Sequence, residues 1–293
     1  MLTATARRAE DLITSKIRRD AAAPAPRQAL DAEVGDWGRI VALRVPALPQ
    51  LSPYNKARGV NEDDLPHVEE VSAFFTGAGI VPTLEVWAGD ASDRLGAALA
   101  HRGFYAGITT ATMHLEMDGR RPVRPTGGSV SIEEIDPEDS GAEYFAVLTG
   151  GYELSQARPE HLAMLRAEHD PATVRRYLAR VNGQPAAAAS LYLHPHGALL
   201  SGAATLPHYR RHGCQSALIT HRLTVASTLT DLAAVTVAFG SASQTNLERA
   251  GFRQTHTRTT WRPLPHCASS ADTSAAWEVE SRCSTGVGLA DSS

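Results

Sequence analysis

The stretch from residue 198 to residue 219 constrains the fold most, because it joins two elements of different type through a basic corner. An apolar run ends at Pro207, as in a strand with a stop, and apolar residues recur at helical spacing from Gly213 onward. A helix start carries unpaired N–H groups and partial positive charge, and Arg210 and Arg211 offer forked donors for phosphate oxygens. The corner therefore fits a phosphate-binding loop, and it fits an ordinary strand–turn–helix with solvated arginines equally well.

Length and charge narrow the class of protein. The chain has 293 residues and a formal net charge of −4 at pH 7, so it can hold two domains and gives no reason to expect nucleic-acid or membrane binding. Its three cysteines are too scattered for a disulfide framework or a Cys-x-x-Cys metal site. No apolar run approaches the roughly 20 residues that span a bilayer, and residues 1–20 lack the apolar segment of a signal peptide. We expect a cytoplasmic protein without a bound metal.

Strand and helix patterns alternate along most of the chain. In the first half they predict a helix at 1–19, a Pro/Ala linker at 21–27, strands at 39–45, 81–87 and 106–116, and helices at 64–78 and 91–101. In the second half they predict strands at 129–135, 175–181, 185–193, 198–206, 233–239 and 253–261, and helices at 137–148, 159–168, from 213 and up to 250. The dipeptide Asn182-Gly183 is typical of a tight hairpin turn.

The basic corner resembles the acyl-CoA-binding motif of the GNAT N-acetyltransferase superfamily. The order is Pro-x-x-Arg-x-x-Gly-x-x-x-Ala-Leu-Ile, here Pro207, Arg210, Gly213, Ala217, Leu218 and Ile219. Gln215 departs from the motif, because the family commonly has Gly or Ala at this position. The resemblance covers residues 129–263 well and 38–118 weakly, and it implies transfer of an acetyl group from acetyl-CoA to the amine of a small molecule.

An internal repeat extends the resemblance to the first half. Residues 86–104 and 237–252 each combine a turn, a helix and a Gly-Phe pair, and a Thr-rich strand follows each. Both copies resemble the C-terminal part of the GNAT module, which implies two tandem modules in an α/β fold with a mixed, mostly antiparallel sheet flanked by helices. Residues 45–65 hold no counterpart of the corner, so we expect the first module to support the second and to wall off one side of its substrate cleft.

The resemblance and the linker composition together divide the chain into five parts. These are an N-terminal helix and linker at 1–30, a degenerate GNAT-like module at 31–118, a Pro/Gly-rich linker at 119–128, the acetyltransferase domain at 129–265 and a disordered tail at 266–293.

The resemblance also implies which residues meet acetyl-CoA. Those predicted beside the pantetheine arm are Ala204, Thr205 and Leu206. Those predicted at the pyrophosphate are Arg210, Arg211, His212, Gly213, Cys214, Gln215 and Ser216. Ser243 is a candidate for a hydrogen bond to the CoA arm, while Ser241 is better explained as a helix N-cap. A nucleophilic Cys214 is a further possibility, and a structural role for this residue is favoured because no His and Asp partners stand out.

Two catalytic roles, the general acid and the general base, have no clearly matching residue in this sequence. The family usually has a tyrosine acid a few residues before the Gly-Phe pair, and here that position is Leu247. Tyr152 and Glu153 lie between the first two helices of the second module, a segment that lines the acceptor pocket in this family. Glu153 is therefore a candidate base or amine anchor, or else a solvated helix-end glutamate.

Three functions remain compatible with the sequence. The first is an N-acetyltransferase for a small amine. The second is a non-catalytic acyl-CoA sensor or scaffold, favoured by Leu247 and by the absence of an obvious base. The third is a mycothiol-synthase-like tandem enzyme with an aminoglycoside-like acceptor. The identity of the acceptor and the oligomeric state stay open.

Overall fold

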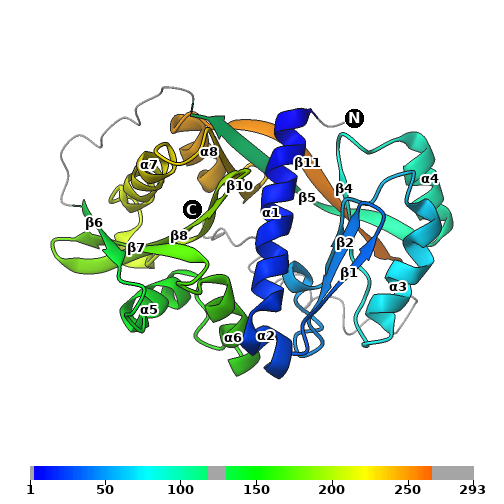
Figure 1. Ribbon diagram of the computed structural model, residues 1–293, viewed down its shortest axis with the longest axis horizontal. Coiled ribbons are helices and arrows are strands. Elements are labelled where there is room, and N and C mark those ends of the chain that lie inside the picture. The colour runs from blue at the N-terminus through cyan, green and yellow to red at the C-terminus, as the bar shows by residue number, and fades with distance from the viewer. Residues whose placement is uncertain (1–2, 118–129, 266–293) are drawn as a thin grey trace.

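The computed structural model describes residues 3–117 and 130–265, and its strands form one twisted sheet (Figure 1). The order is β1-β2-β3-β4-β11-β5-β10-β9-β8-β7-β6. The strands are β1 Glu33–Trp37, β2 Ile40–Arg44, β3 Lys56–Arg58, β4 Leu84–Trp87, β5 Phe104–Glu116, β6 Val130–Ile135, β7 Val174–Val181, β8 Gln184–His194, β9 Gly197–Thr205, β10 Leu232–Ala238 and β11 Arg253–Pro263. Within the described ranges, neighbours run antiparallel except β3–β4 and β9–β10. The predicted mixed, mostly antiparallel α/β fold is confirmed.

Helices cover both faces of the sheet. They are α1 Ala4–Ala22, α2 Pro24–Ala29, α3 Val68–Thr76, α4 Asp93–His101, α5 Ala142–Gly151, α6 Pro159–Glu168, α7 Cys214–Ala226 and α8 Ala242–Arg249, with short 3-10 turns at Ser52–Tyr54, Leu65–His67 and Pro207–Tyr209. Successive strand residues face opposite sides. Leu199 therefore packs with Leu12 of α1, while Leu200 packs in the cluster that contains Leu218 of α7. The central strands of the second half are thus buried on both faces.

The two repeat units interlock through their last strands. Strand β11 lies between β4 and β5, the two strands of the first unit, and β5 lies between β10 and β11, the two strands of the second. The β5–β11 pairing runs from His114↔Arg253 to Phe104↔Pro263, almost the full length of both strands. Each half of the chain therefore completes the sheet of the other, although the predicted ranges 31–118 and 129–265 are separate in the sequence.

The repeat recognised in the sequence is repeated in the backbone. Ser92 and Ser241 each cap a helix through the side-chain oxygen, which accepts a hydrogen bond from the N–H three residues on. Gly103 and Gly251 each take a positive φ, 78° and 97°, where the chain turns from helix to strand. The N-cap role predicted for Ser241 is confirmed.

Several local predictions differ from the structure. Residues 24–29 form helix α2, so the predicted linker at 21–27 is wrong; Pro24 is tolerated there because it occupies the first helical turn, where its missing N–H is not needed. Helix α5 begins at Ala142 and not at residue 137, since carboxylates of Asp136 and Asp139 bond nearby backbone N–H groups in a turn. Strands β1 and β3 were not predicted. The predicted linker 119–128 and tail 266–293 lie outside the described residues.

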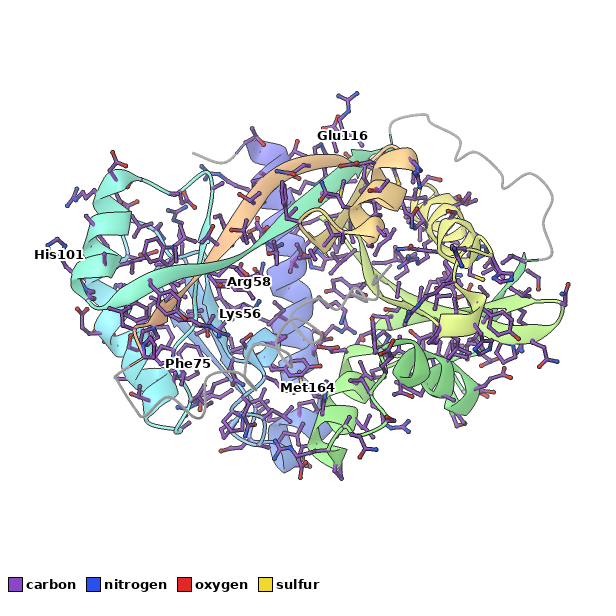
Figure 2. The ribbon with its side chains drawn as sticks, turned by 180° about the vertical axis from the view of Figure 1, so that it is seen from behind. Lys56, Arg58, Phe75, His101, Glu116 and Met164 are labelled. Carbon is purple, nitrogen blue, oxygen red and sulfur yellow. The ribbon has the colours of Figure 1, made fainter. Side chains whose placement is uncertain are left out.

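Helix α1 is fixed to the middle of the sheet by a buried carboxylate. Glu10 is fully buried, and it accepts hydrogen bonds from Arg58 (2.6 Å), Arg258 (2.8 Å) and Thr112 (2.9 Å). Figure 2 shows Arg58 beside the long helix. Burial by itself raises the pKa of Glu10, but the charges of Arg258 and Arg58 and the hydrogen bond from His256 outweigh it, so the pKa lies below its ordinary value. One glutamate thus joins α1 to strands β3, β5 and β11.

We expect the substitution Glu10→Gln to lower the free energy of unfolding by about 3–5 kcal/mol, because it leaves buried arginines without their counter-charge. Urea unfolding at pH 7 measures this loss, and Asp11→Asn, an exposed change on the same helix, is the control. Because the folded-state pKa of Glu10 is depressed, its contribution is present above pH 4.5 and lost as the pH falls below that value. The acid-induced loss of stability should be smaller in Glu10→Gln; equal loss in both proteins would contradict this role.

Candidate functional site

The parallel strands β9 and β10 separate in the middle of the sheet. They pair only at Ala198↔Ala233 and Leu199↔Ala234, although β9 continues to Thr205 and stays paired to β8 throughout. A bulge in the β8–β9 ladder falls at Gly202, whose φ is 44°. A bulge bends a strand and changes the direction of its backbone groups. Residues 201–203 are partly exposed, and beyond Leu199 the edge of β9 that faces away from β8 has no strand partner.

The corresponding pair in the first half also has two register pairs, Ala57↔Leu84 and Arg58↔Glu85, but these cover most of its shorter strands. Strands β3 and β4 are also parallel, and hydrogen bonds join Ala57 N–H to Thr83 O (2.8 Å) and Val60 N–H to Glu85 O (3.1 Å). The buried Arg58 and Glu85 occupy this join. The two halves therefore share a topology. The backbone N–H and C=O groups along the parallel pair are more available to a ligand in the second half than in the first.

Helix α7 follows β9 after the corner, and its first turn is unobstructed. Its N-cap is Gly213, with φ 81° and no side-chain capping bond, and a Cβ at this position would meet no atom within 4 Å. Arg211 also has a positive φ, 66°, and the side chains of Arg211, His212 and Ser216 are exposed. Backbone N–H groups at such a helix start attract anions. The predicted strand–corner–helix geometry is present.

Gln215 connects the first turn of α7 to α8. Its amide donates to Ser243 Oγ (3.1 Å), and its side-chain oxygen accepts from Asn246 Nδ2 (2.5 Å). Two residues predicted to meet CoA, Gln215 and Ser243, are therefore bonded to each other. Asn246 is a third member that the sequence did not reveal, because only the packing of α8 on α7 places it there.

Arg210 and Glu153, predicted on opposite sides of the reaction, form an ion pair. Arg210 Nη2 lies 3.1 Å from Glu153 Oε1, and both side chains are partly exposed, 32% and 47%. Glu153 follows α5 with a φ of 57°. The end of α5 also packs against the end of β9, where a Cβ on Gly151 would lie 2.7 Å from that of Ala204. The corner and the loop after α5 thus both lie at the end of β9.

Tyr152 and the end of α6 meet β9 at the bulge. The backbone N–H of Ala203 hydrogen-bonds the Tyr152 hydroxyl. Burial, and then the charge of Glu168, raise the pKa of Tyr152 above its ordinary value. His169, the residue after Glu168, fills the space at Gly202, where a Cβ would lie 2.2 Å from the His169 ring. The bulge therefore requires glycine at position 202 for two reasons: the positive φ, and the lack of space for a Cβ beside His169.

Buried polar groups hold this bulge from both faces. Tyr144 bonds Nδ1 of His169 at 2.7 Å, and burial lowers the pKa of His169 to about 3, so the imidazole is neutral. From the other face, Arg222 of α7 donates to the carbonyls of Ser190 (3.0 Å) and Ser201 (3.5 Å). Burial lowers the pKa of Arg222 to about 10. These contacts satisfy groups that the irregular ladder would otherwise leave unpaired.

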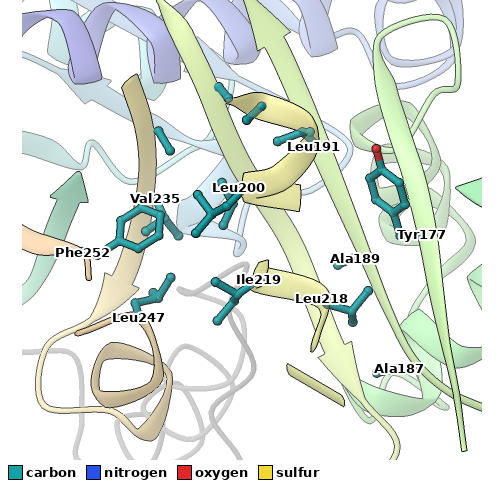
Figure 3. Packing of buried hydrophobic residues seen from close by; sticks show 14 of the residues in the cluster. Tyr177, Ala187, Ala189, Leu191, Leu200, Leu218, Ile219, Val235, Leu247 and Phe252 are labelled. Carbon is teal, nitrogen blue, oxygen red and sulfur yellow. The ribbon is translucent and has the colours of Figure 1, made fainter. Parts of the chain in front are cut away.

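Leu247 lies in the apolar core. It is 3% exposed and belongs to the cluster that contains Ile219, Val235 and Phe252 (Figure 3). Cys214 belongs to the same cluster, and burial raises the pKa of its thiol. A buried thiol with a raised pKa is a poor nucleophile, which agrees with the structural role favoured for Cys214.

The described residues contain neither a cluster of metal-ligating side chains nor a helix that could span a membrane. In residues 3–117 and 130–265, no three His, Cys, Asp or Glu side chains gather as a metal ion would require. None of the helices in these ranges is long and apolar enough to cross a bilayer.

Comparison with solved structures identifies the fold. A GCN5-related N-acetyltransferase from Kribbella flavida is similar with a TM-score of 0.62 and 18% identity, over 91% of this chain and 98% of that one. A tandem GNAT protein from the clavulanic acid biosynthesis pathway has a TM-score of 0.58 and 16% identity, over 92% and 98%. A GCN5-related N-acetyltransferase from Sphaerobacter thermophilus has a TM-score of 0.55 and 13% identity, over 89% and 93%.

No protein-family model and no curated protein matches the sequence. At these identities the structural likeness establishes the fold. The chain has the GCN5-related N-acetyltransferase fold in its tandem form, as the sequence predicted.

Replacing Gly202 by Ala tests the bulge. We expect a loss of unfolding free energy larger than about 1–3 kcal/mol, because the new Cβ is strained by the positive φ and also meets His169 at 2.2 Å. Gly183→Ala is the matched control, since Gly183 has a φ of 81° and no atom within 4 Å of its Cβ position. Denaturant unfolding compares the two variants, and equal losses would show that the contact with His169 is unimportant.

Proposed function

We propose that the protein is an N-acetyltransferase that moves an acetyl group from acetyl-CoA to the amine of a small molecule. The observation that carries the proposal is the separation of β9 and β10, which leads directly into the basic, glycine-capped start of α7. The likeness to N-acetyltransferase structures supports it.

The residues around the cleft fit acetyl-CoA. The edge of β9 at Ala204, Thr205 and Leu206 would line the pantetheine arm with backbone groups. The corner would hold the pyrophosphate through Arg210, Arg211 and the N–H groups from His212 to Ser216, and Gly213 leaves room for a close approach. Ser243 would act mainly through Gln215, to which it is bonded.

Tyr152 is positioned to serve as the proton donor, a role that the apolar side chain of Leu247 cannot fill. When bound, acetyl-CoA supplies an activated thioester, whose sulfur needs a proton as it leaves. The raised pKa keeps the Tyr152 hydroxyl protonated at neutral pH, and its hydrogen bond to the N–H of Ala203 holds it at the bulge. Glu153 pairs with Arg210, so its part would be to orient the corner.

A second function, a non-catalytic acyl-CoA sensor, is favoured by the burial of Leu247 where the fold usually carries its acid. Thiol release in the presence of acetyl-CoA separates the two functions. The assay uses a panel of alkylamines, arylamines, polyamines and aminoglycoside-like amino sugars, the last class testing a mycothiol-synthase-like specificity. Acetyl-CoA binding without turnover on any amine would support the sensor.

Arg210→Ala tests the donor site. We expect acetyl-CoA binding, measured by calorimetry, to weaken by about 1–3 kcal/mol, as for a lost charged hydrogen bond. Glu153→Gln is the companion variant, and we expect it to leave binding unchanged or tighten it by up to about 1 kcal/mol, since it releases Arg210 from a partly exposed pair. Unchanged affinity for acetyl-CoA in Arg210→Ala would show that the basic corner is not part of the donor site.

Tyr152→Phe tests the proton donor. We expect kcat to fall about 10²–10⁴-fold, the usual contribution of general acid catalysis, with the dissociation constant of acetyl-CoA unchanged. Tyr105→Phe, on β5, is a control tyrosine away from the bulge. A Tyr152→Phe enzyme with the wild-type kcat would assign thiolate protonation to water or to another group.

A further inference from the structure

We infer that Lys56 is an acyl-accepting residue, whose side-chain amine takes the acetyl group of a thioester and forms a stable amide. The thioester named here, acetyl-CoA, rests on the proposed function. Lys56 begins strand β3 of the first half, in a part of the chain to which the proposed function assigns no reacting group. The chain contains 28 Lys and Arg residues, and only Lys16 and Lys56 are lysines.

Lys56 belongs to a cluster of charged side chains that surrounds Glu10 and Glu85 (Figure 2). Its Nζ lies 3.6 Å from Glu85 Oε2, and Arg58 Nη2 lies 3.5 Å from Glu85 Oε1. Arg258 Nε lies 3.9 Å from the same Glu85 oxygen. Both arginines also pair with Glu10, at 2.6 Å and 2.8 Å. Three basic side chains and two carboxylates therefore meet at one place.

The cluster holds more positive than negative charge. The basic side chains outnumber the carboxylates by one, and the imidazole of His256, 2.8 Å from Glu10, can only add positive charge. Each arginine lies within 2.8 Å of Glu10, whereas Lys56 lies 3.6 Å from Glu85, longer than an ordinary hydrogen bond. Lys56 is therefore the surplus cation, and loss of its charge leaves two arginines facing two carboxylates.

These surroundings favour the neutral amine, which is the form that attacks a thioester. A lysine becomes a better nucleophile when it is desolvated or lies next to another cation. Both conditions hold for Lys56. Burial lowers the pKa of its amine, the charge of Glu85 opposes this shift, and the charges of Arg58 and Arg258 lower the pKa further. An arginine at this position would stay protonated and unreactive.

Lys56 is open to a small reagent. Its side chain is 19% exposed, compared with 5% for Arg58 and 7% for Lys16. A thioester can reach such an amine, whereas the active site of a separate enzyme needs a side chain that projects from the surface. Lys16 is held in an ion pair with Asp20 at 2.6 Å and donates to the Glu168 carbonyl at 2.9 Å. Lys16 is therefore an internal control for Lys56.

The transfer balances without a further reactant. The unprotonated Nζ of Lys56 bonds to the thioester carbonyl carbon as the carbon–sulfur bond breaks. The proton that the nitrogen loses ends on the sulfur of the released thiol, and nothing is oxidised or reduced. The amide product is uncharged, so the transfer removes the surplus charge of the cluster.

Peptide mass spectrometry after incubation with acetyl-CoA tests the assignment. In the folded wild type the acetyl group should appear on Lys56 before Lys16, whereas in urea-unfolded protein the two lysines should react at similar rates. The variant Lys56→Arg should lose this label, and the variant Lys16→Arg should keep it. Equal labelling of the two lysines in the folded wild type, or acetylation confined to groups other than Lys56, would overturn the inference.

The pH dependence of labelling distinguishes an activated lysine from one that is merely exposed. Because the pKa of Lys56 is lowered, its neutral form is present at lower pH. The rate of acetylation should therefore level off at a lower pH than for the free compound Nα-acetyl-lysine, whose side-chain pKa is roughly 10.4. A pH profile that matches the free compound would contradict activation by the neighbouring charges.

A second thioester, S-acetyl-N-acetylcysteamine, separates this inference from the proposed function. It carries the reactive end of acetyl-CoA without the nucleotide, so its reaction with Lys56 does not need the donor site. If calorimetry shows no binding of acetyl-CoA, the proposed function fails, and labelling by the short thioester still supports Lys56 as a nucleophile. If neither thioester labels Lys56, the inference is overturned, whatever the turnover assay with amines shows.

Discussion

The pairing of β5 with β11 is the constraint on which the rest of the structure depends. Strand β5 of the first repeat unit lies between β11 and β10 of the second, and β11 lies between β5 and β4 of the first. Either half alone would therefore expose open sheet edges. Glu10 strengthens this junction, because its partners Arg58, Thr112 and Arg258 come from three separate strands. The two modules are therefore one folding unit.

The sheet contains two parallel strand pairs, β3–β4 and β9–β10, which share one topology but differ in structure. Backbone hydrogen bonds connect β3 and β4, and the buried charged residues Arg58 and Glu85 belong to these two strands. Strands β9 and β10 are longer and also pair at two positions, so the edge of β9 beyond Leu199 has no strand partner on that side, and a bulge falls at Gly202. Backbone groups left unpaired by secondary structure need another partner. In the proposed function the donor arm is that partner, and the network of Tyr144, His169 and Arg222 keeps the irregular strand in place.

Much of this architecture follows from local patterns. Helix periodicity, the turn at Asn182-Gly183 and the repeated Gly-Phe pairs rest on neighbours close in sequence, and they appear as predicted apart from the start of α5. The short strands β1 and β3 and the helix α2 were missed, because their few residues have no distinctive period and are stabilised by pairing or packing with distant segments. The predicted CoA and catalytic residues remain predictions, and the structure brings them together near the end of β9 and the start of α7.

The sequence by itself determined the fold, the repeat and the strand–corner–helix that fits a phosphate, since each depends on residues within about one supersecondary unit. It also placed a leucine where the fold usually has its acid. Only the tertiary structure decided that the two repeats interlock, that Arg210 faces Glu153, and that His169 packs on Gly202 at the bulge. The physical reason is that strand partners and the electrostatic surroundings of a carboxylate are set by groups far apart in the chain, which come together only when the core packs.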